Sequence, residues 1–329
     1  MADLPEERVE IQPPFYCSGM DVFGPYMVKQ KRSEVKRYGL LITCLYSRAI
    51  HLKLLDDLST DCFINALRCF LALRGTVKVL RCDQGSNFIG ADNELRQALT
   101  ELDSVKMENF LAHKQVEFKF NVPHASEQGG VWERQIRTVR KTLKSVVEFS
   151  NARLDDSSLR TLLHEAAYIV NSRPLSSVSV NDPLAEPPVT PNALLHGKLE
   201  GALPPPGVFT PEDVFARKRW RRVQYLSQLF AGRWKREYLL ALQERRKWHT
   251  PQRNLREGDL VLLFEEMANR NQWPMGIVSR AIKDKDGLVR KVKLRVSNAK
   301  SVARGDKVKM ISELERPVQR VVLLVPMSE

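Results

Sequence analysis

The stretch Pro123-His-Ala-Ser-Glu-Gln-Gly-Gly-Val-Trp-Glu-Arg-Gln-Ile-Arg-Thr-Val-Arg-Lys-Thr-Leu-Lys144 decides the fold that the sequence predicts. Its glycine pair precedes a long run without Gly or Pro, which predicts a loop that feeds a helix starting near Gly130. An apolar stripe recurs along this run at helical spacing, formed by Trp132, Ile136, Val139, Leu143 and Val146. The stripe predicts a helix that packs one face against a core.

A neighbouring face of the same helix is charged. Glu133 stands near its start, and a row of cations follows, formed by Arg137, Arg140, Lys141 and Lys144. A single acid at a helix start is ordinarily explained by the helix dipole. Whether Glu133 has a chemical role therefore depends on the residues upstream.

Length and charge limit the class of protein. The chain has 329 residues, 43% of them hydrophobic, which leaves room for two domains with a core. Its formal net charge of +13 predicts attraction to a polyanion such as nucleic acid. Because the sequence has no apolar run of membrane-spanning length and no signal or lipidation motif, we expect an intracellular protein without membrane contact.

The cysteines support the same expectation. They are five in number, an odd count, and they lie inside apolar runs rather than in Cys-x-x-Cys patterns. This usage predicts buried free thiols in a reducing compartment, and it argues against a structural zinc site.

Short apolar segments and helical segments alternate along the first half of the chain. The predicted strands lie within 15–25, 36–46, 49–54, 76–83 and 116–120. The predicted helices cover 59–74, about 92–112, the run after Gly130, and 157–170. This order predicts a mixed α/β sheet.

Two aspartates end strands of this predicted sheet. Asp21 and Asp83 each follow an apolar strand segment, and sites in α/β sheets are built at strand ends. Either residue alone is explained as a turn former. Three carboxylates that converge would repel one another without a cation between them, so Asp21, Asp83 and Glu133 together predict a site for Mg²⁺ or Mn²⁺.

Four motifs together resemble the integrase region of BEL/Pao-type long-terminal-repeat retrotransposon polyproteins. They are Gly19-Met-Asp-Val-Phe-Gly-Pro25, Arg81-Cys-Asp-Gln-Gly-Ser-Asn-Phe88, Gly129-Gly-Val-Trp-Glu-Arg134 and Asn171-Ser-Arg-Pro-Leu175. The resemblance implies a ribonuclease H-like mixed-sheet core of the retroviral integrase type over residues 15–175, after a lead-in over 1–14. It also implies that Asp21, Asp83 and Glu133 are the catalytic triad.

The resemblance further implies two-metal phosphoryl transfer, in which Asp21 bridges two Mg²⁺ or Mn²⁺ ions and the other two acids each complete one site. The same site would process the 3′ ends of the element DNA and join them to target DNA. Gln84, Asn87 and His124 would position substrate. For two of these residues a structural role is the alternative: Asn87 would hold a turn, and His124 would form a hydrogen bond within a loop.

The spacing departs from the retroviral pattern. Here 49 residues separate Asp83 from Glu133, which is more than in retroviral integrases, and the helical insert around 92–114 accounts for the difference. Lys119, where the shorter spacing would end, cannot bind a metal ion. Glu127 competes as the third acid, but it lies in the predicted loop before the helix.

Three further regions follow the core. Residues 176–211 form a Pro-rich linker, 212–255 a basic amphipathic helix, and 256–329 a small β barrel that resembles the SH3-like C-terminal domain of integrases. The predicted basic helix begins with a basic cluster formed by Arg217, Lys218, Arg219, Arg221 and Arg222. This cluster and the cations that follow Glu133 would bind DNA phosphates. A helix that packs on its neighbour explains the same pattern equally well, and the cluster also suits a nuclear import signal.

Two hypotheses of different classes follow. The first is an active retrotransposon integrase, acting in the nucleus as a homo-oligomer on DNA, with chromatin contact through the barrel. The second is an inactive or domesticated copy that binds nucleic acid without catalysis. A cut-and-paste transposase is third, and the barrel and the motif Asn171–Leu175 argue against it. Because relatives carry a His/Cys zinc domain before the core, we expect the chain to be a polyprotein fragment.

Overall fold

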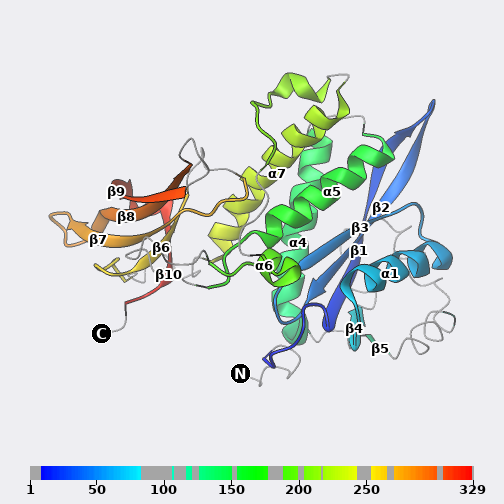
Figure 1. Cartoon of the computed structure of the whole chain (residues 1–329), viewed down its shortest axis with the longest axis horizontal. Helices are drawn as coiled ribbons and strands as arrows, with labels where there is room; N and C mark the ends of the chain where they lie inside the picture. Colours follow the sequence, from blue (N-terminus) through cyan, green and yellow to red (C-terminus); the bar gives the residue numbers. More distant parts are fainter. Residues whose placement is uncertain are drawn as a thin grey trace. The chain divides into compact units, whose positions relative to one another are not determined.

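The computed structural model describes residues 9–82, 106, 116–120, 126–149, 154–176, 188–198, 204–215, 218–242, 253–264, 270–301 and 307–327. The chain forms two compact units (Figure 1). The first comprises Met1–Asn171 and Pro206–Trp234, and the second comprises Ser172–Pro205 and Lys235–Glu329. Each unit is described by itself below.

A mixed five-stranded sheet forms the centre of the first unit, in the order β3-β2-β1-β4-β5. β2 is antiparallel to both β1 and β3, whereas β1, β4 and β5 are parallel. The strands are β1 (Cys17–Gln30), β2 (Ser33–Cys44), β3 (Ile50–Leu55), β4 (Val79–Cys82) and β5 (Glu117–Phe120). The predicted mixed α/β sheet is confirmed.

β1 is longer than predicted. The sequence placed its end at the turn-forming pair Gly24-Pro25, but the strand continues to Gln30 with a bulge between Phe23 and Tyr26. A bulge absorbs residues that cannot keep the regular ladder, such as a proline without an N–H group. Gly24 has a φ of 130°, which glycine adopts without strain.

Three helices accompany the sheet: α1 (Thr60–Arg74), α4 (Ser126–Phe149) and α5 (Asp156–Asn171). Ser59 caps α1 as predicted, since its side chain accepts a hydrogen bond from the Cys62 N–H. α4 starts four residues earlier than predicted, so Gly129 and Gly130 lie inside the helix and Glu127 does not lie in a loop. The buried stripe on α4 outweighs the cost of two glycines, about 1 kcal/mol each; its described members are Ile136, Val139, Leu143 and Val146.

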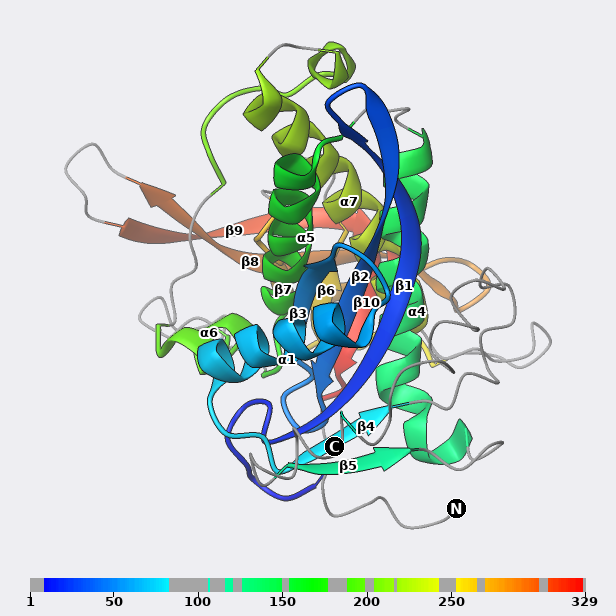
Figure 2. The same ribbon diagram turned by 90° about the vertical axis from the view of Figure 1, so that its right-hand side faces the viewer.

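α1 and α4 cover opposite faces of the sheet (Figure 2). Cross-strand pairing puts Asp21, Leu41 and Leu52 on one face, and Met20, Ile42 and His51 on the other. The ring of Phe70 on α1 lies 5.3 Å from that of His51, so α1 covers the second face. Arg140 on α4 contacts Asp21, so α4 covers the first.

The motif that starts at Asn171 has a structural role at the edge of this sheet. The buried side chain of Asn171, the last residue of α5, accepts from the Ile50 N–H and donates to the Ile50 carbonyl, each at 2.8 Å. These bonds satisfy backbone groups of β3 that have no strand beside them. Asn171 therefore fastens α5 to the sheet.

The predicted Pro-rich linker contains a short helix that the sequence did not suggest, α6 (Pro191–His196), and a second, η3 (Pro211–Val214), begins at its last residue. The basic helix after it is α7 (Arg219–Leu242). Within the first unit α7 buries an apolar stripe formed by Val223, Leu226, Phe230 and Trp234. Arg233 and Gln224 of α7 also bond to Ser145 and Glu165. The packing interpretation of this helix is confirmed for the part that lies in the first unit.

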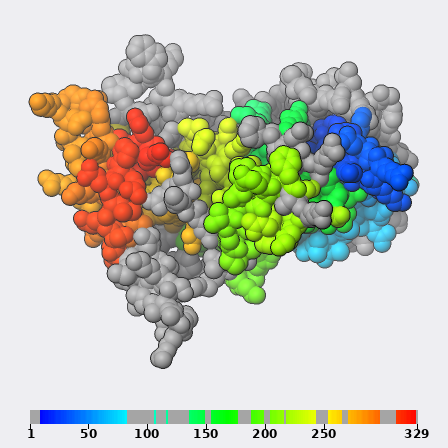
Figure 3. Space-filling model, turned by 90° about the horizontal axis from the view of Figure 1, so that it is seen from above, coloured from blue at the N-terminus to red at the C-terminus, as the bar shows by residue number. Residues whose placement is uncertain are grey.

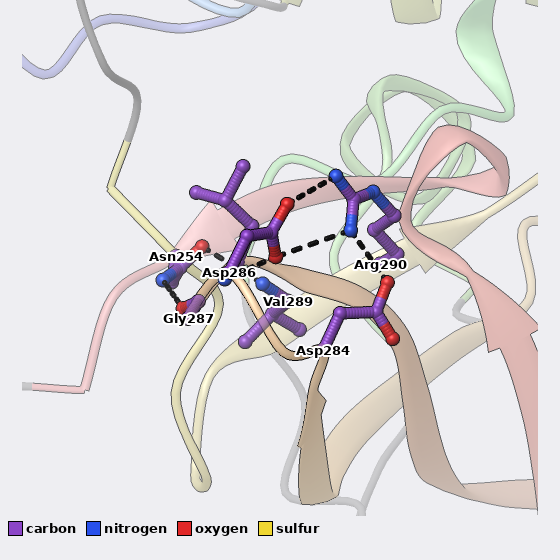
Figure 4. A network of polar contacts seen from close by, with 7 residues as sticks. Asn254, Asp284, Asp286, Gly287, Val289 and Arg290 are labelled. Carbon is purple, nitrogen blue, oxygen red and sulfur yellow. Dashed lines mark hydrogen bonds and ion pairs between the residues drawn. The ribbon is translucent and has the colours of Figure 1, made fainter.

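The second unit is built on an antiparallel five-stranded sheet in the order β10-β6-β7-β8-β9. Its elements are β6 (Leu260–Leu263), β7 (Met275–Lys283), β8 (Val289–Ser301), β9 (Lys307–Pro317), η4 (Val318–Arg320) and β10 (Val321–Val325). The predicted turn at Asp286-Gly287 joins β7 to β8. Arg290 fixes this turn through hydrogen bonds to Asp284 and Asp286, and Asn254 bonds to the backbone of Gly287 and Val289 (Figure 4).

None of the five cysteines is in a disulfide. Cys17 and Cys44 are buried, but Cys69 is exposed and Cys62 and Cys82 are half-buried. The expectation of buried thiols was therefore wrong for three of them. Cys62 and Cys69 fall between the buried positions of α1, which is amphipathic rather than enclosed.

Candidate active site

Asp21 lies on the central strand β1 and is only 8% exposed. Its carboxylate faces α4, where Nη1 of Arg140 donates to Oδ2 at 2.9 Å. A buried carboxylate is costly unless a cation or hydrogen-bond donors accompany it. The structure therefore provides a sheltered negative charge in the middle of the sheet, balanced by a helix cation.

α4 runs beside β1 in the same direction, because Arg140 contacts Asp21 and, beyond the end of α4, the Lys29 N–H donates to the Leu154 carbonyl at 2.8 Å. Tyr26 lies five residues beyond Asp21 on β1, and burial raises the pKa of its hydroxyl above the ordinary value. Arg140 opposes this rise in pKa and Glu148 adds to it, so both lie within electrostatic reach of Tyr26. The segment 140–148 of α4 thus follows the segment 21–26 of β1.

The side chains of the other two proposed acids lie outside the described part of the structure. Glu133 belongs to α4, seven residues before Arg140, and its side chain lies outside the described residues. Seven residues make about two helical turns, so Glu133 and Arg140 start from the same face of α4, roughly 10 Å apart along its axis. Asp83 lies outside the described residues, but Cys82, the residue before it, pairs with Met20, the residue before Asp21.

The predicted positioning residues Gln84, Asn87 and His124 lie outside the described part of the chain. The predicted DNA-binding cations of α4 are described. Arg137, Lys141 and Lys144 are exposed, while Arg140 is half-buried against Asp21. Lys144 lies 3.8 Å from Glu148, a long and exposed ion pair.

The basic cluster at the start of α7 is arranged differently. Arg221 donates two hydrogen bonds to Asp213, at 2.6 and 3.0 Å, and one to the Val208 carbonyl. Its guanidinium also lies 5.3 Å from the Phe209 ring centre, and it holds the pKa of Asp213 below the ordinary value. Arg219 pairs with Asp155 at 2.6 Å. Lys218 is exposed, Arg222 is half-buried, and Arg217 lies outside the described residues.

The sequence did not predict that Arg140 pairs with Asp21. The signal was present in the spacing, because Arg140 follows Glu133 by two helical turns and so shares its face. Among the described residues, no group of three His, Cys, Asp or Glu side chains could hold a metal ion. In the same part of the chain, no helix is long and apolar enough to cross a membrane.

Comparison with known proteins gives two kinds of similarity. A family model described as a family of unknown function, DUF5641, matches residues 218–324, about a third of the chain. No curated protein matches the chain.

The chain is also similar to solved integrase structures. The catalytic core domain of BIV integrase is 13% identical, with a TM-score of 0.35, over 50% of this chain and 88% of that one. A simian T-cell lymphotropic virus intasome in complex with a PP2A regulatory subunit is 13% identical, with a TM-score of 0.34, over 99% and 84%. The HTLV-2 integrase catalytic core domain in complex with magnesium, in a dimeric form, is 15% identical, with a TM-score of 0.33, over 56% and 98%.

Proposed function

We propose that this chain is a BEL/Pao-type retrotransposon integrase, which processes the 3′ ends of element DNA and joins them to target DNA. One observation carries the proposal: buried Asp21 on the central strand faces the helix that bears Glu133. The strand order β3-β2-β1-β4-β5, with only β2 reversed, is that of the ribonuclease H-like fold and supports the same assignment. The register Met20 to Cys82 supports Asp83 as the second acid.

The proposed residues suit a divalent cation. Asp21, Asp83 and Glu133 would hold Mg²⁺ or Mn²⁺ through hard carboxylate oxygens. Such ions would supply Lewis-acid stabilisation of charge on the phosphodiester oxygens. The burial of Asp21 supports this role, because an interaction with a cation is stronger where water is excluded.

The α4 cations are the proposed DNA contact. Arg137, Lys141 and Lys144 are exposed beside the half-buried Arg140, which suits phosphates that approach Asp21. When a metal ion neutralises the carboxylate of Asp21, a DNA phosphate would give Arg140 a second anionic partner. We retain Gln84, Asn87 and His124 as proposed positioning residues.

Residues 256–329 of the second unit are proposed to be an SH3-like barrel that contacts DNA or chromatin in a homo-oligomer acting in the nucleus. Its strand order, in which the last strand pairs with the first and follows the 3-10 turn η4, supports an SH3-like topology. The domain boundaries at residues 15, 176, 212 and 256 belong to the same proposal.

A strand-joining assay tests the chemistry. DNA with a recessed 3′ end and a plasmid target are incubated with Mn²⁺ or Mg²⁺ and with wild type, Asp21→Asn, Asp83→Asn or Glu133→Gln. We expect joined product from wild type and a loss of at least about 100-fold in each variant, because each removes a metal ligand. Glu127→Gln is the matched control, and it should retain activity if Glu133 is the third acid.

The outcomes separate the two hypotheses. Joined product that survives in Asp21→Asn would refute the active site. DNA binding by wild type without product, under conditions where a related integrase works, would instead favour the non-catalytic nucleic-acid-binding protein. Asp83→Asn should leave salt-sensitive DNA binding nearly intact, because one carboxylate contributes little to phosphate contacts.

A further inference from the structure

The β1–β2 hairpin extends beyond the rest of its sheet. β3 pairs with β2 only from Tyr38 to Thr43, whereas β1 and β2 pair with each other as far as Gln30 and Ser33. In the described pairing, the outer part of the hairpin is thus a two-stranded ribbon. Lys31 and Arg32 form its turn, both are exposed, and Figure 3 shows the blue hairpin at the surface.

This ribbon follows the direction of α4. Arg140 contacts Asp21 near the base of the ribbon, and both Arg140 and Glu148 act on Tyr26 further out. Beyond Tyr26, the Lys29 N–H donates to the Leu154 carbonyl at 2.8 Å, between the end of α4 and the start of α5. The ribbon and the part of α4 after Arg140, which bears the exposed Lys141 and Lys144, therefore run side by side from Asp21 toward the turn of the hairpin.

The two faces of the ribbon differ. Tyr26 and Val28 are buried, so they mark the face toward the helices. By strand alternation, Lys29 and its near neighbour Lys36 stand on the opposite face, and both are exposed. Lys31 and Arg32 lie at the end of the ribbon, accessible to a ligand that runs along α4.

We propose that Lys31 and Arg32 bind the backbone of the DNA duplex whose reacting end lies at Asp21. The inference rests on the proposed function for its partner. Gln30 lies nine positions beyond Asp21 on β1, a span of roughly 30 Å. A duplex rises about 3.4 Å per base pair, so the contact falls about nine base pairs from the reacting phosphodiester.

Charge and shape favour a duplex over an acidic protein. Residues 29–36 carry four cations and the single carboxylate Glu34, and α4 adds its own cations along the same line. Duplex DNA offers a charge about every 1.7 Å of its axis, so it can neutralise the whole row without interruption. A short acidic segment of a protein would reach only a part of it.

The test measures the salt dependence of binding to a 20-base-pair duplex by fluorescence anisotropy. Wild type is compared with Lys31→Gln/Arg32→Gln and with the control Lys29→Gln/Lys36→Gln, which removes the same net charge from the other face. The slope of log Kd against log salt should fall by about 1.8 in the tip variant, for two lost phosphate contacts. It should stay near the wild-type slope in the control.

Equal slopes in the two variants would overturn the inference, because the tip would then act only through its net charge. Displacement of the duplex by poly-glutamate at equal charge would also overturn it, in favour of an acidic protein partner. The inference and the proposed function can fail separately: a slope difference without strand joining would refute the integrase chemistry and leave the tip contact standing. Thermal unfolding of both variants shows that the fold is unchanged.

Discussion

Helices α4 and α7 look alike in sequence, since each combines an apolar stripe with a row of cations, but their cations have different surroundings. On α4, Arg137 and Lys141 are exposed, and the Arg140 between them bonds to the carboxylate of Asp21. On α7, Arg219 and Arg221 are paired with Asp155 and Asp213. An arginine engaged in two short bonds to a carboxylate must give these up before it can bind a phosphate. The comparison therefore separates the exposed cations of α4, where we propose that DNA binds, from the two α7 arginines that carboxylates already engage.

The largest expected effect is a loss of folding stability when a buried side chain of α7 is removed. Phe230 is fully buried, so Phe230→Ala should destabilise the protein by about 3–5 kcal/mol through lost burial and a cavity. Chemical denaturation monitored by circular dichroism measures the change. Phe215→Ala is the control, because that ring is 79% exposed and its loss should be nearly neutral. A small effect of Phe230→Ala would mean that α7 is not a structural helix.

The free energy of unfolding should depend on pH in two different windows, one set by His51 in the sheet and the other by the α7 ion pair of Arg221 and Asp213. Burial first, and then nearby charges, lower the pKa of His51 to about 3, so the unfolded chain binds more protons between pH 3 and about 6.5. The free energy of unfolding should fall by up to about 1.4 kcal/mol per pH unit as the pH drops through this window. The α7 pair behaves differently: Arg221 lowers the pKa of Asp213, so its contribution is lost only below about pH 4.

Urea denaturation at a series of pH values measures these two windows. His51→Gln should reduce the slope between pH 6.5 and about pH 3 and leave the contribution of the Asp213 pair below about pH 4 in place. His164, whose pKa is also lowered by burial, accounts for a remaining slope. An unchanged profile in His51→Gln would show that His51 is accessible to protons in the folded protein.

The smallest expected effect concerns Arg221. Arg221→Gln should lower the Tm and leave the Kd for duplex DNA unchanged, because the side chain is already bonded to Asp213 and Val208. Lys218→Gln, at an exposed neighbouring position, should leave both quantities unchanged. A clear loss of DNA affinity in Arg221→Gln would erase the distinction between α4 and α7.

The sequence predicted what depends on regular patterns. Apolar periodicity identified the stripe of α4, the capped helix α1 and the hairpin of β2 with β3, because burial of alternate or helical positions leaves a local trace. It failed where local preference gave way to the rest of the fold: Gly24-Pro25 became a bulge, and Gly129-Gly130 entered a helix. Such positions depend on neighbours that are distant in sequence.

The residues of the candidate site, like the fold, were predicted only in part. The sequence pointed to Asp21 and Glu133, and Asp21 is buried beside α4. The predicted strand end at Asp21 was wrong, because β1 continues from Cys17 through a bulge to Gln30. The partners of individual cations could not be predicted, because Arg221 meets Asp213 through the fold of an irregular segment and Arg140 meets Asp21 across 119 residues. Charge patterns show that cations are present, whereas only the fold shows which of them are already paired.

Lysine footprinting tests the proposed DNA surface most directly. The protein is acetylated briefly with and without a saturating DNA duplex, and the modification of each lysine is measured by mass spectrometry. Lys141 and Lys144 on α4 should be protected by DNA, and Lys218 beside α7 should react equally in both samples. Protection of Lys218 with full reactivity of Lys141 and Lys144 would contradict the proposal that DNA lies along α4 beside Asp21.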